Sequence, residues 1–211
     1  MKILRFDKGR CVAEGADGVP VIFRERRAGL VWPGASTPGY LGIWGIWDHL
    51  DPFTGQCPVQ LVEEIEESVP ADFFRKLTPA LDRWRPAAAY ADLSDRTRTK
   101  QTMFAGYLRS NHVSQRTRIV DMNEYRLSEM APTMRDWLAR KLVMMSEMSA
   151  AYRQLRTLRP DDLRAFDRVE PEDRMFAAAA LGYVVASLEM YPAEDRRERR
   201  KRARKRGEGY Q

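Results

Sequence analysis

The sequence contains few of the residues that build thiolate, histidine or nucleotide sites. Its 211 residues include two cysteines, Cys11 and Cys57, and two histidines, His49 and His112. The cysteines lack the spacing of a zinc site, so we expect free thiols in a reducing compartment. The dipeptide Gly-Lys does not occur, which excludes a P-loop, and no Gly-x-Gly-x-x-Gly fingerprint follows a strand. Enzyme chemistry therefore falls to the carboxylates.

Long apolar segments are also scarce. The longest, residues 175–191, is interrupted by Gly182, Ser187 and Glu189 and falls short of the ~20 residues that cross a bilayer. The first residues, Met-Lys-Ile-Leu-Arg-Phe-Asp-Lys, contain no hydrophobic signal region. We therefore expect a soluble, cytoplasmic protein with no membrane partner.

Positive charge gathers near the end of the chain. The net charge is +6, and residues 194–206 alone contain nine cations against three acids, so the rest of the chain is neutral. The cations are Arg196, Arg197, Arg199, Arg200, Lys201, Arg202, Arg204, Lys205 and Arg206. Such a run repels itself and gains little from folding, which favours a polyanion as partner, and we favour DNA. A solubilising helical extension is the alternative interpretation.

Hydrophobic periodicity changes between strand and helix along the chain. Residues 1–39 read as short strands and loops. Further strands are predicted at residues 40–47, 59–65, 87–92 and 118–122, the first two as a hairpin, and helices at 70–84, 99–109, 128–155 and 171–191. The segment 40–47 is apolar nearly throughout, which is typical of a strand buried on both faces. The pattern predicts an α/β domain in which helices cover a mixed β-sheet.

Three aspartates stand where this pattern would support chemistry. Asp48 follows the apolar strand, Asp92 ends a later strand, and Asp173 lies in the first turn of the last helix. In α/β sheets, ligands gather at the carboxyl ends of strands. Aspartates that converge there would repel one another unless Mg²⁺ or Mn²⁺ neutralised them, and two such ions can act on a phosphodiester.

Each aspartate also has a purely structural interpretation. Asp48 can open a turn together with Asp51, and Asp92 can cap the polar segment that follows it. Asp173 follows Glu172 and Pro171, the usual composition of a helix start, where acids complement the helix dipole. The combination of the three carries more weight than any one of them.

The combined pattern resembles the C-terminal nuclease domain of phage terminase large subunits, over residues 40–190. Two segments carry the resemblance, Tyr90-Ala-Asp92-Leu-Ser-Asp95 and Glu172-Asp173-Arg174-Met-Phe-Ala-Ala-Ala-Ala180. In that family an aspartate ends a strand before small and polar residues, and an Asp-Asp-Arg-type segment opens an alanine-rich helix. Glu172 stands where the family has its leading aspartate. Asp48 is the available match to the family's first-strand aspartate.

The resemblance implies an RNase H-like nuclease domain over residues 40–193, preceded by the segment 1–39 and followed by a flexible basic tail, residues 194–211. It implies that Asp48, Asp92 and Asp173 bind two Mg²⁺ or Mn²⁺ ions for endonuclease cleavage. Double-stranded DNA would be the substrate, held by the tail and by the loop cations Arg96, Arg98 and Lys100. A separate packaging ATPase or portal protein would be a partner in the host cytoplasm. The alternative is a non-catalytic DNA-binding or assembly protein in which the same sheet is a scaffold.

Overall fold

The computed structural model describes residues 1–7, 10–15, 17–33, 38–91, 106, 117–122, 127–157 and 172–190. Its strands are β1 (Lys2–Asp7), β2 (Arg10–Glu14), β3 (Pro20–Val31), β4 (Gly39–Trp47), β5 (Val59–Glu67), β6 (Ala88–Ala91), β7 (Arg118–Asp121) and β8 (Val143–Met144). Its helices are α1 (Pro70–Trp84), α3 (Leu127–Ala139), α4 (Ala150–Thr157) and α6 (Glu172–Met190). In this part of the chain, no helix is long and apolar enough to cross a membrane.

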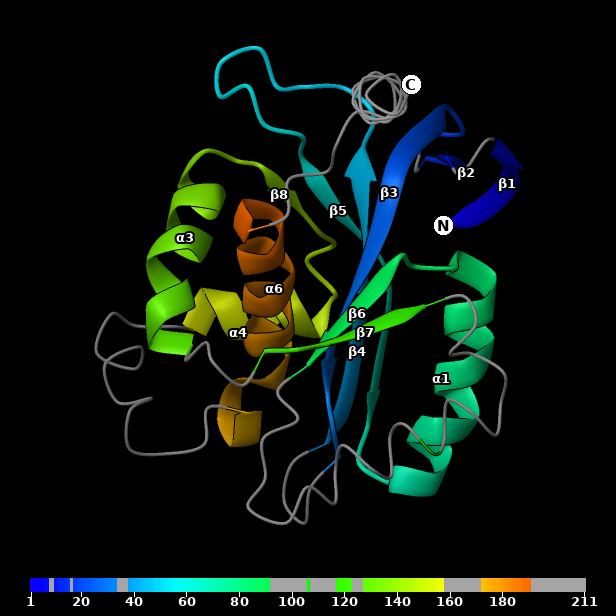
Figure 1. Cartoon of the computed structure of the whole chain (residues 1–211), viewed down its shortest axis with the longest axis vertical. Helices are drawn as coiled ribbons and strands as arrows, with labels where there is room; N and C mark the ends of the chain where they lie inside the picture. The colour runs from blue at the N-terminus through cyan, green and yellow to red at the C-terminus, as the bar shows by residue number, and fades with distance from the viewer. Residues whose placement is uncertain are drawn as a thin grey trace, which may run out of the picture.

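The strands form one mixed sheet in the order β1-β2-β3-β4-β5-β8 (Figure 1). The first five strands are antiparallel to their neighbours. The long strand β3 lies at the centre, because its first residues pair with β2 and its last residues pair with β6. Strands β6 and β7 run parallel to β3, and β8 runs parallel to β5.

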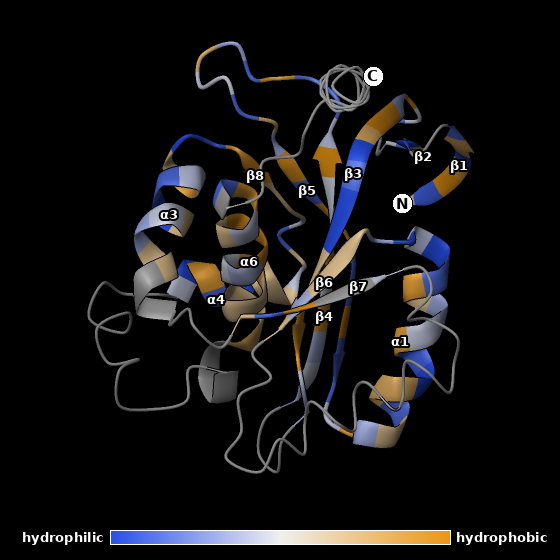
Figure 2. Cartoon of the chain, in the orientation of Figure 1, coloured by the Kyte–Doolittle hydropathy of each residue, from blue (hydrophilic) through white to orange (hydrophobic). Residues whose placement is uncertain are grey.

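Helices cover both faces of this sheet. Helix α1 packs on one face, and α3, α4 and α6 pack on the other (Figure 1). Two separate hydrophobic cores result. Phe73, Leu77 and Trp84 fill the core under α1, whereas Tyr40 and Trp44 belong to the core under α6. Figure 2 shows hydrophobic residues on the side of α1 that faces the sheet. The arrangement confirms the predicted class, an α/β domain in which helices cover a mixed sheet.

The helix predicted at residues 70–84 forms with these bounds. Pro70 is compatible with the first helical turn, where its missing N–H has no intrahelical partner. The helix ends at Arg85, whose left-handed φ of 48° lets its N–H bond to the carbonyl of Leu81. The buried guanidinium of Arg26 on β3 donates to the carbonyls of Trp84 and Arg85 at 2.9 Å each. Arg26 thus fixes the carboxyl end of α1 to the centre of the sheet.

The hairpin predicted between residues 40–47 and 59–65 is confirmed as β4 and β5, but the long helix predicted at 128–155 is wrong. The chain leaves the helical path after Ala139, and Lys141 adopts a left-handed φ of 56°. The N–H of Leu142 then bonds to the carbonyl of Trp137, and β8 joins the sheet beside β5. The apolar pattern of the sequence continues through this break. Because β8 is only two residues long, hydrophobic periodicity gave no sign of it.

The domain boundary expected at residue 39 falls inside the sheet. Strand β3, which was expected to belong to a separate N-terminal segment, pairs with β4 over most of its length and forms the central strand. The helix predicted at 99–109 and the basic tail, residues 194–211, lie outside the described residues, apart from Gly106.

Candidate functional site

The direction of α6 across the sheet decides which residues meet. Near its beginning, the ring of Phe176 lies 5.6 Å from the ring of Tyr40, which is in register with Val31 at the end of β3. Farther along, α6 passes directly over Gly29, and near its end Ser187 Oγ accepts a hydrogen bond from Arg27 Nη1 at 3.0 Å. As the residue number increases along α6, the number of the β3 residue beside it decreases. The helix runs antiparallel to β3, and its first turn lies at the carboxyl end of β3.

Two parallel strands end at this same edge of the sheet. The last residue of β6, Ala91, is in register with Leu30, and the last residue of β7, Asp121, is in register with Ala91. Asp173 stands in the first turn of α6, whose backbone is at this edge. Asp92 directly follows Ala91 in the sequence but lies outside the described residues. The backbone thus brings the first turn of α6, the end of β6 and Asp121 to one edge.

Strand β3 contributes no acid to this edge. The one carboxylate in its sequence is Glu25, at the opposite half of the strand. The positions of β3 that face α6 are Arg27, Gly29 and Val31. Arg27 is buried, donates from Nε to Glu25 Oε1 at 2.7 Å, and places its guanidinium 5.8 Å from the ring centroid of Tyr90. A cation paired within the core therefore occupies the middle of the central strand.

Asp48 does not join the other predicted acids. It follows β4, which is antiparallel to β3, and Trp47 is in register with Phe23 near the start of β3. Ala91 is in register with Leu30, seven residues farther along β3, which separates the two ends by about 23 Å at 3.3 Å per residue. The structure thus places Asp48 at the opposite edge of the sheet from Ala91, because β4 runs antiparallel to β3, whereas β6 runs parallel to it.

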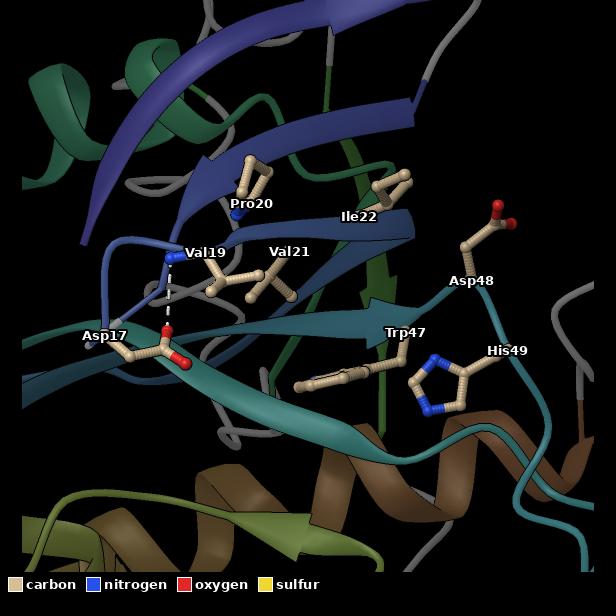
Figure 3. A pocket seen from close by; sticks show the side chains of 8 residues that line it. All are labelled: Asp17, Val19, Pro20, Val21, Ile22, Trp47, Asp48 and His49. Atoms are coloured by element: carbon tan, nitrogen blue, oxygen red, sulfur yellow. Dashed lines mark hydrogen bonds between the residues drawn. The ribbon is translucent and has the colours of Figure 1, made fainter.

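The surroundings of Asp48 are those of a surface turn. Its Oδ2 pairs with Arg10 Nη1 at 3.1 Å, and its backbone N–H bonds to the carbonyl of Ile22. A pocket of about 460 Å³ lies next to it, between Val21 on β3 and Trp47 on β4 (Figure 3). The ring of His49 packs edge-on against the Trp47 indole, at 4.8 Å between centroids. The Asp48 side chain points out of this pocket in Figure 3.

The turn after Asp48 has its own carboxylate. Asp51 accepts hydrogen bonds from the backbone N–H groups of Phe53 and Thr54 and from the Thr54 hydroxyl. These bonds, those of Thr54 first, lower the pKa of Asp51 from its ordinary value. The structural interpretation of this segment as an aspartate-stabilised turn is therefore confirmed.

A second group of acids lies on β5 and faces α4. Glu64 Oε2 accepts a hydrogen bond from the Tyr40 hydroxyl at 3.0 Å, and Glu64 Oε1 accepts one from the N–H of Ala150 at 2.9 Å. Burial first, and the Glu64 carboxylate second, raise the pKa of Tyr40 well above its ordinary value. Glu66 is two residues farther along β5, nearer the edge where β3 ends, and is in register with Tyr40. Its Oε2 lies 3.6 Å from Arg153 Nη2. Glu64 anchors the start of α4, whereas Glu66 remains accessible.

No group of three His, Cys, Asp or Glu side chains suited to a metal ion occurs among the residues that the structure describes. Of the predicted ligands, Asp92 lies outside those residues, and for Asp173 the description is limited to the backbone. The predicted DNA contacts Arg96, Arg98 and Lys100 and the nine tail cations also lie outside the described residues.

Sequence reasoning missed Asp121. The rule that selected Asp92, a carboxylate at the carboxyl end of a parallel strand, applies equally to Asp121, which ends the next predicted strand. The helix predicted between the two strands was the signal that they run parallel, and this signal would have identified Asp121.

Comparison with known proteins finds resemblance in solved structures alone. No family model and no curated protein matches the sequence. The large terminase nuclease of the thermophilic phage G20c, with bound zinc, is 13% identical, with a TM-score of 0.45 over 87% of this chain and 92% of that one. The g2p large terminase nuclease domain of bacteriophage SPP1, with bound Mn, is 12% identical, with a TM-score of 0.45 over 80% and 87%. The fowlpox virus Holliday junction resolvase is 10% identical, with a TM-score of 0.40 over 78% and 98%.

Proposed function

We propose that this chain is a metal-dependent DNA endonuclease domain of the kind that phage packaging terminases contain, and that Asp92 and Asp173 are metal ligands. The observation that carries the proposal is the antiparallel course of α6 over β3. It brings the first turn of α6, with Asp173, to the edge where β6 ends one residue before Asp92. The first two residues of one resemblance segment, Tyr90 and Ala91, and the first turn of α6, which opens the other, therefore approach the same edge of the sheet.

The donor set at this edge suits a hard divalent cation. Carboxylate oxygens are the ligands that Mg²⁺ and Mn²⁺ prefer, and neither thiolate nor imidazole is part of the proposed set. When bound there, two such ions would lower the pKa of an attacking water and stabilise the leaving oxygen of the phosphodiester. The residues of the chain would hold the ions and orient the scissile phosphate between them. Asp121 and Glu66 are described acids at this edge and are candidates for a third ligand, whereas Glu67, the next residue of β5, pairs with Lys76.

The substrate in this proposal is double-stranded DNA. The cations Arg96, Arg98 and Lys100 follow Asp92 in sequence and would contact the phosphates beside the cleaved bond. The nine cations of residues 196–206 would add affinity that is independent of base sequence. Because the sequence contains no P-loop, a separate packaging ATPase or portal protein would drive any translocation of the DNA.

One observation favours a second candidate, a non-catalytic DNA-binding or assembly protein. The central strand has no acid in the half that ends at this edge, and its middle holds the buried cation Arg27. If β3 is the counterpart of the family's first strand, the aspartate that the resemblance leads us to expect there is absent. A fold that has lost this carboxylate would serve as a scaffold, with the basic tail as its DNA contact.

Nicking of supercoiled plasmid in the presence of Mn²⁺ or Mg²⁺ separates the two candidates. Asp92→Asn and Asp173→Asn should each reduce the rate at least about 100-fold, because each removes a charged ligand. Asp48→Asn is the matched control, since the same chemical change is made at the opposite edge, and it should keep the wild-type rate. Glu66→Gln and Asp121→Asn identify the third ligand.

Circular dichroism must show all five variants folded. Wild-type protein that binds plasmid but does not nick it with either ion would refute the nuclease proposal and leave the scaffold. Equal loss of activity in Asp48→Asn and Asp173→Asn would show that the site does not lie at the edge proposed here.

A further inference from the structure

The outermost strand of the sheet, β1, is exposed on both of its faces. It ends the strand order, and among the described residues β2 alone pairs with it, on its inner side. Leu4 is 47% exposed and Phe6 is 37% exposed. Figure 1 shows β1 at the margin of the molecule. An edge strand with unpaired backbone groups and exposed apolar side chains is a template for another strand.

The sequence of β1 is complementary to itself around Phe6. When two copies of a strand pair antiparallel across a twofold axis at Phe6, Phe6 faces Phe6 of the second copy. Arg5 then faces Asp7 of the second copy, and Asp7 faces its Arg5. Opposite residues in this register share a face of the sheet, as antiparallel pairing requires. Each symmetric pairing therefore contains two ion pairs and one aromatic pair.

The local structure of β1 suits this register. The irregularity in its pairing with β2 lies between Ile3 and Arg5, so the segment from Arg5 to Asp7 is regular. The Phe6 ring is held in place by two guanidiniums, with Arg26 at 5.2 Å and Arg85 at 5.0 Å from its centroid. A fixed aromatic side chain at the axis loses little conformational entropy when a second copy binds.

We propose that β1 joins two copies of this chain into a twofold-symmetric dimer, in which the two β1 strands pair antiparallel at Phe6. The interface is isologous, because the same three residues of each copy meet. The dimer extends one sheet into the next across the axis. With three residue pairs it is a small interface, so we expect a dissociation constant of about 10–100 µM.

Sedimentation equilibrium over a range of concentrations tests the proposal with a charge exchange. Arg5→Asp places an acid opposite Asp7 of the second copy, and Asp7→Arg places a cation opposite its Arg5. Each single variant should therefore weaken dimerisation at least about 10-fold. The combined variant Arg5→Asp/Asp7→Arg restores opposite charges in exchanged positions and should return to within about 3-fold of the wild type. Glu14→Arg, a charge reversal on the neighbouring strand β2, should leave dimerisation unchanged.

Thermal denaturation must show every variant folded, since Asp7 also lies opposite Arg10 within one copy. The combined variant contains the same change at Asp7, so it separates loss of the interface from loss of stability. A wild-type chain that stays monomeric up to about 1 mM would overturn the proposal. A dimer that ignores both single variants, or one that the combined variant fails to restore, would overturn it as well.

Discussion

Replacing Gly29 by alanine tests the contact that positions α6. A Cβ atom at residue 29 would lie 2.0 Å from the carbonyl oxygen of Ala180, 2.6 Å from its carbonyl carbon and 3.0 Å from its Cα. Ordinary contact begins at 3.4 Å, so the oxygen must retreat by about 1.4 Å, the difference between 3.4 and 2.0. Because all three atoms belong to the backbone, no side-chain rotation relieves the overlap. Either α6 moves away from the sheet or β3 bends.

The expected cost of Gly29→Ala follows from this overlap. Overpacking of a core costs about 1–3 kcal/mol, and the rigid backbone on both sides places this substitution at about 3 kcal/mol. For a chain of this size, that lowers the melting temperature by about 10 °C. Gly18→Ala is the control, because Gly18 has a φ of +79° with open space around it, and the conformational strain alone should cost about 1 kcal/mol. Urea denaturation of both variants measures the difference.

A second substitution tests the mechanism of the Gly29→Ala effect. Ala180→Gly removes a methyl group from the same contact but leaves the three clashing atoms in place. It should therefore not rescue Gly29→Ala, and the combined variant should be about 1 kcal/mol less stable still, because glycine inside a helix is unfavourable. If Gly29→Ala lies within about 0.5 kcal/mol of the wild type, or if Ala180→Gly restores its stability, the close approach of α6 to β3 is wrong.

Two further predictions concern Tyr40 and the basic tail. Burial and Glu64 raise the pKa of Tyr40, so the folded state binds the phenolic proton more tightly than the unfolded state. The stabilisation should therefore be fully present below the ordinary pKa of 10.0 and should decline as the pH rises above it. Glu64→Gln should lower the pKa of Tyr40 in an ultraviolet titration. An unchanged titration would contradict the Tyr40–Glu64 hydrogen bond. Deleting residues 195–211 should flatten the plot of log DNA affinity against log salt by about 4 units, if about half of the nine cations contact phosphates at once. Equal slopes for the two chains would assign DNA contact to the body of the protein.

Local patterns predicted the elements whose partners are near in sequence. The helix Pro70–Trp84 was readable because its apolar stripe and its proline start agree. The β4–β5 hairpin was readable because the turn signal of residues 51–55 separates two segments with the residue pattern of strands. The role of β3 was not readable. Its centre contains Arg26 and Arg27, which are atypical of a buried strand, and the structure stabilises them by the carboxyl end of α1 and by Glu25 and Ser187. Apart from Glu25, those partners come from distant parts of the chain, so periodicity could not anticipate them.

The site was predicted in part for the same reason. Asp173 was placed correctly at the start of a helix, and the strand before Asp92 forms with Ala91 at its end. Asp48 was expected at this edge because β4 was taken as the match to the first strand of the family that the sequence resembles. The central strand is β3, and β4 runs antiparallel to it. Asp48, which follows β4, therefore lies at the opposite edge of the sheet from the end of β3.

In the proposed metal site, the geometry of β3 limits where a third ligand can come from. None of the three positions that face α6 can supply it, since Gly29 touches the α6 backbone, Val31 is packed in the core and Arg27 is a buried cation. The third ligand of the proposed site must therefore come from another strand. The two candidates, Glu66 and Asp121, lie on different faces of the sheet.

Glu66 is in register with Tyr40, which belongs to the core under α6, whereas Asp121 is in register with Ala91, which belongs to the core under α1. Residues in register across a sheet share a face, so Glu66 lies on the side of α6 and Asp173. Glu66 is two strands away from Val31, so about 9.6 Å separates the Cα atoms of these two residues. A glutamate side chain together with a bound ion can span this distance. Glu66→Gln should therefore reduce metal-dependent nicking more than Asp121→Asn. The reverse order would place the metal site on the α1 face, away from the first turn of α6.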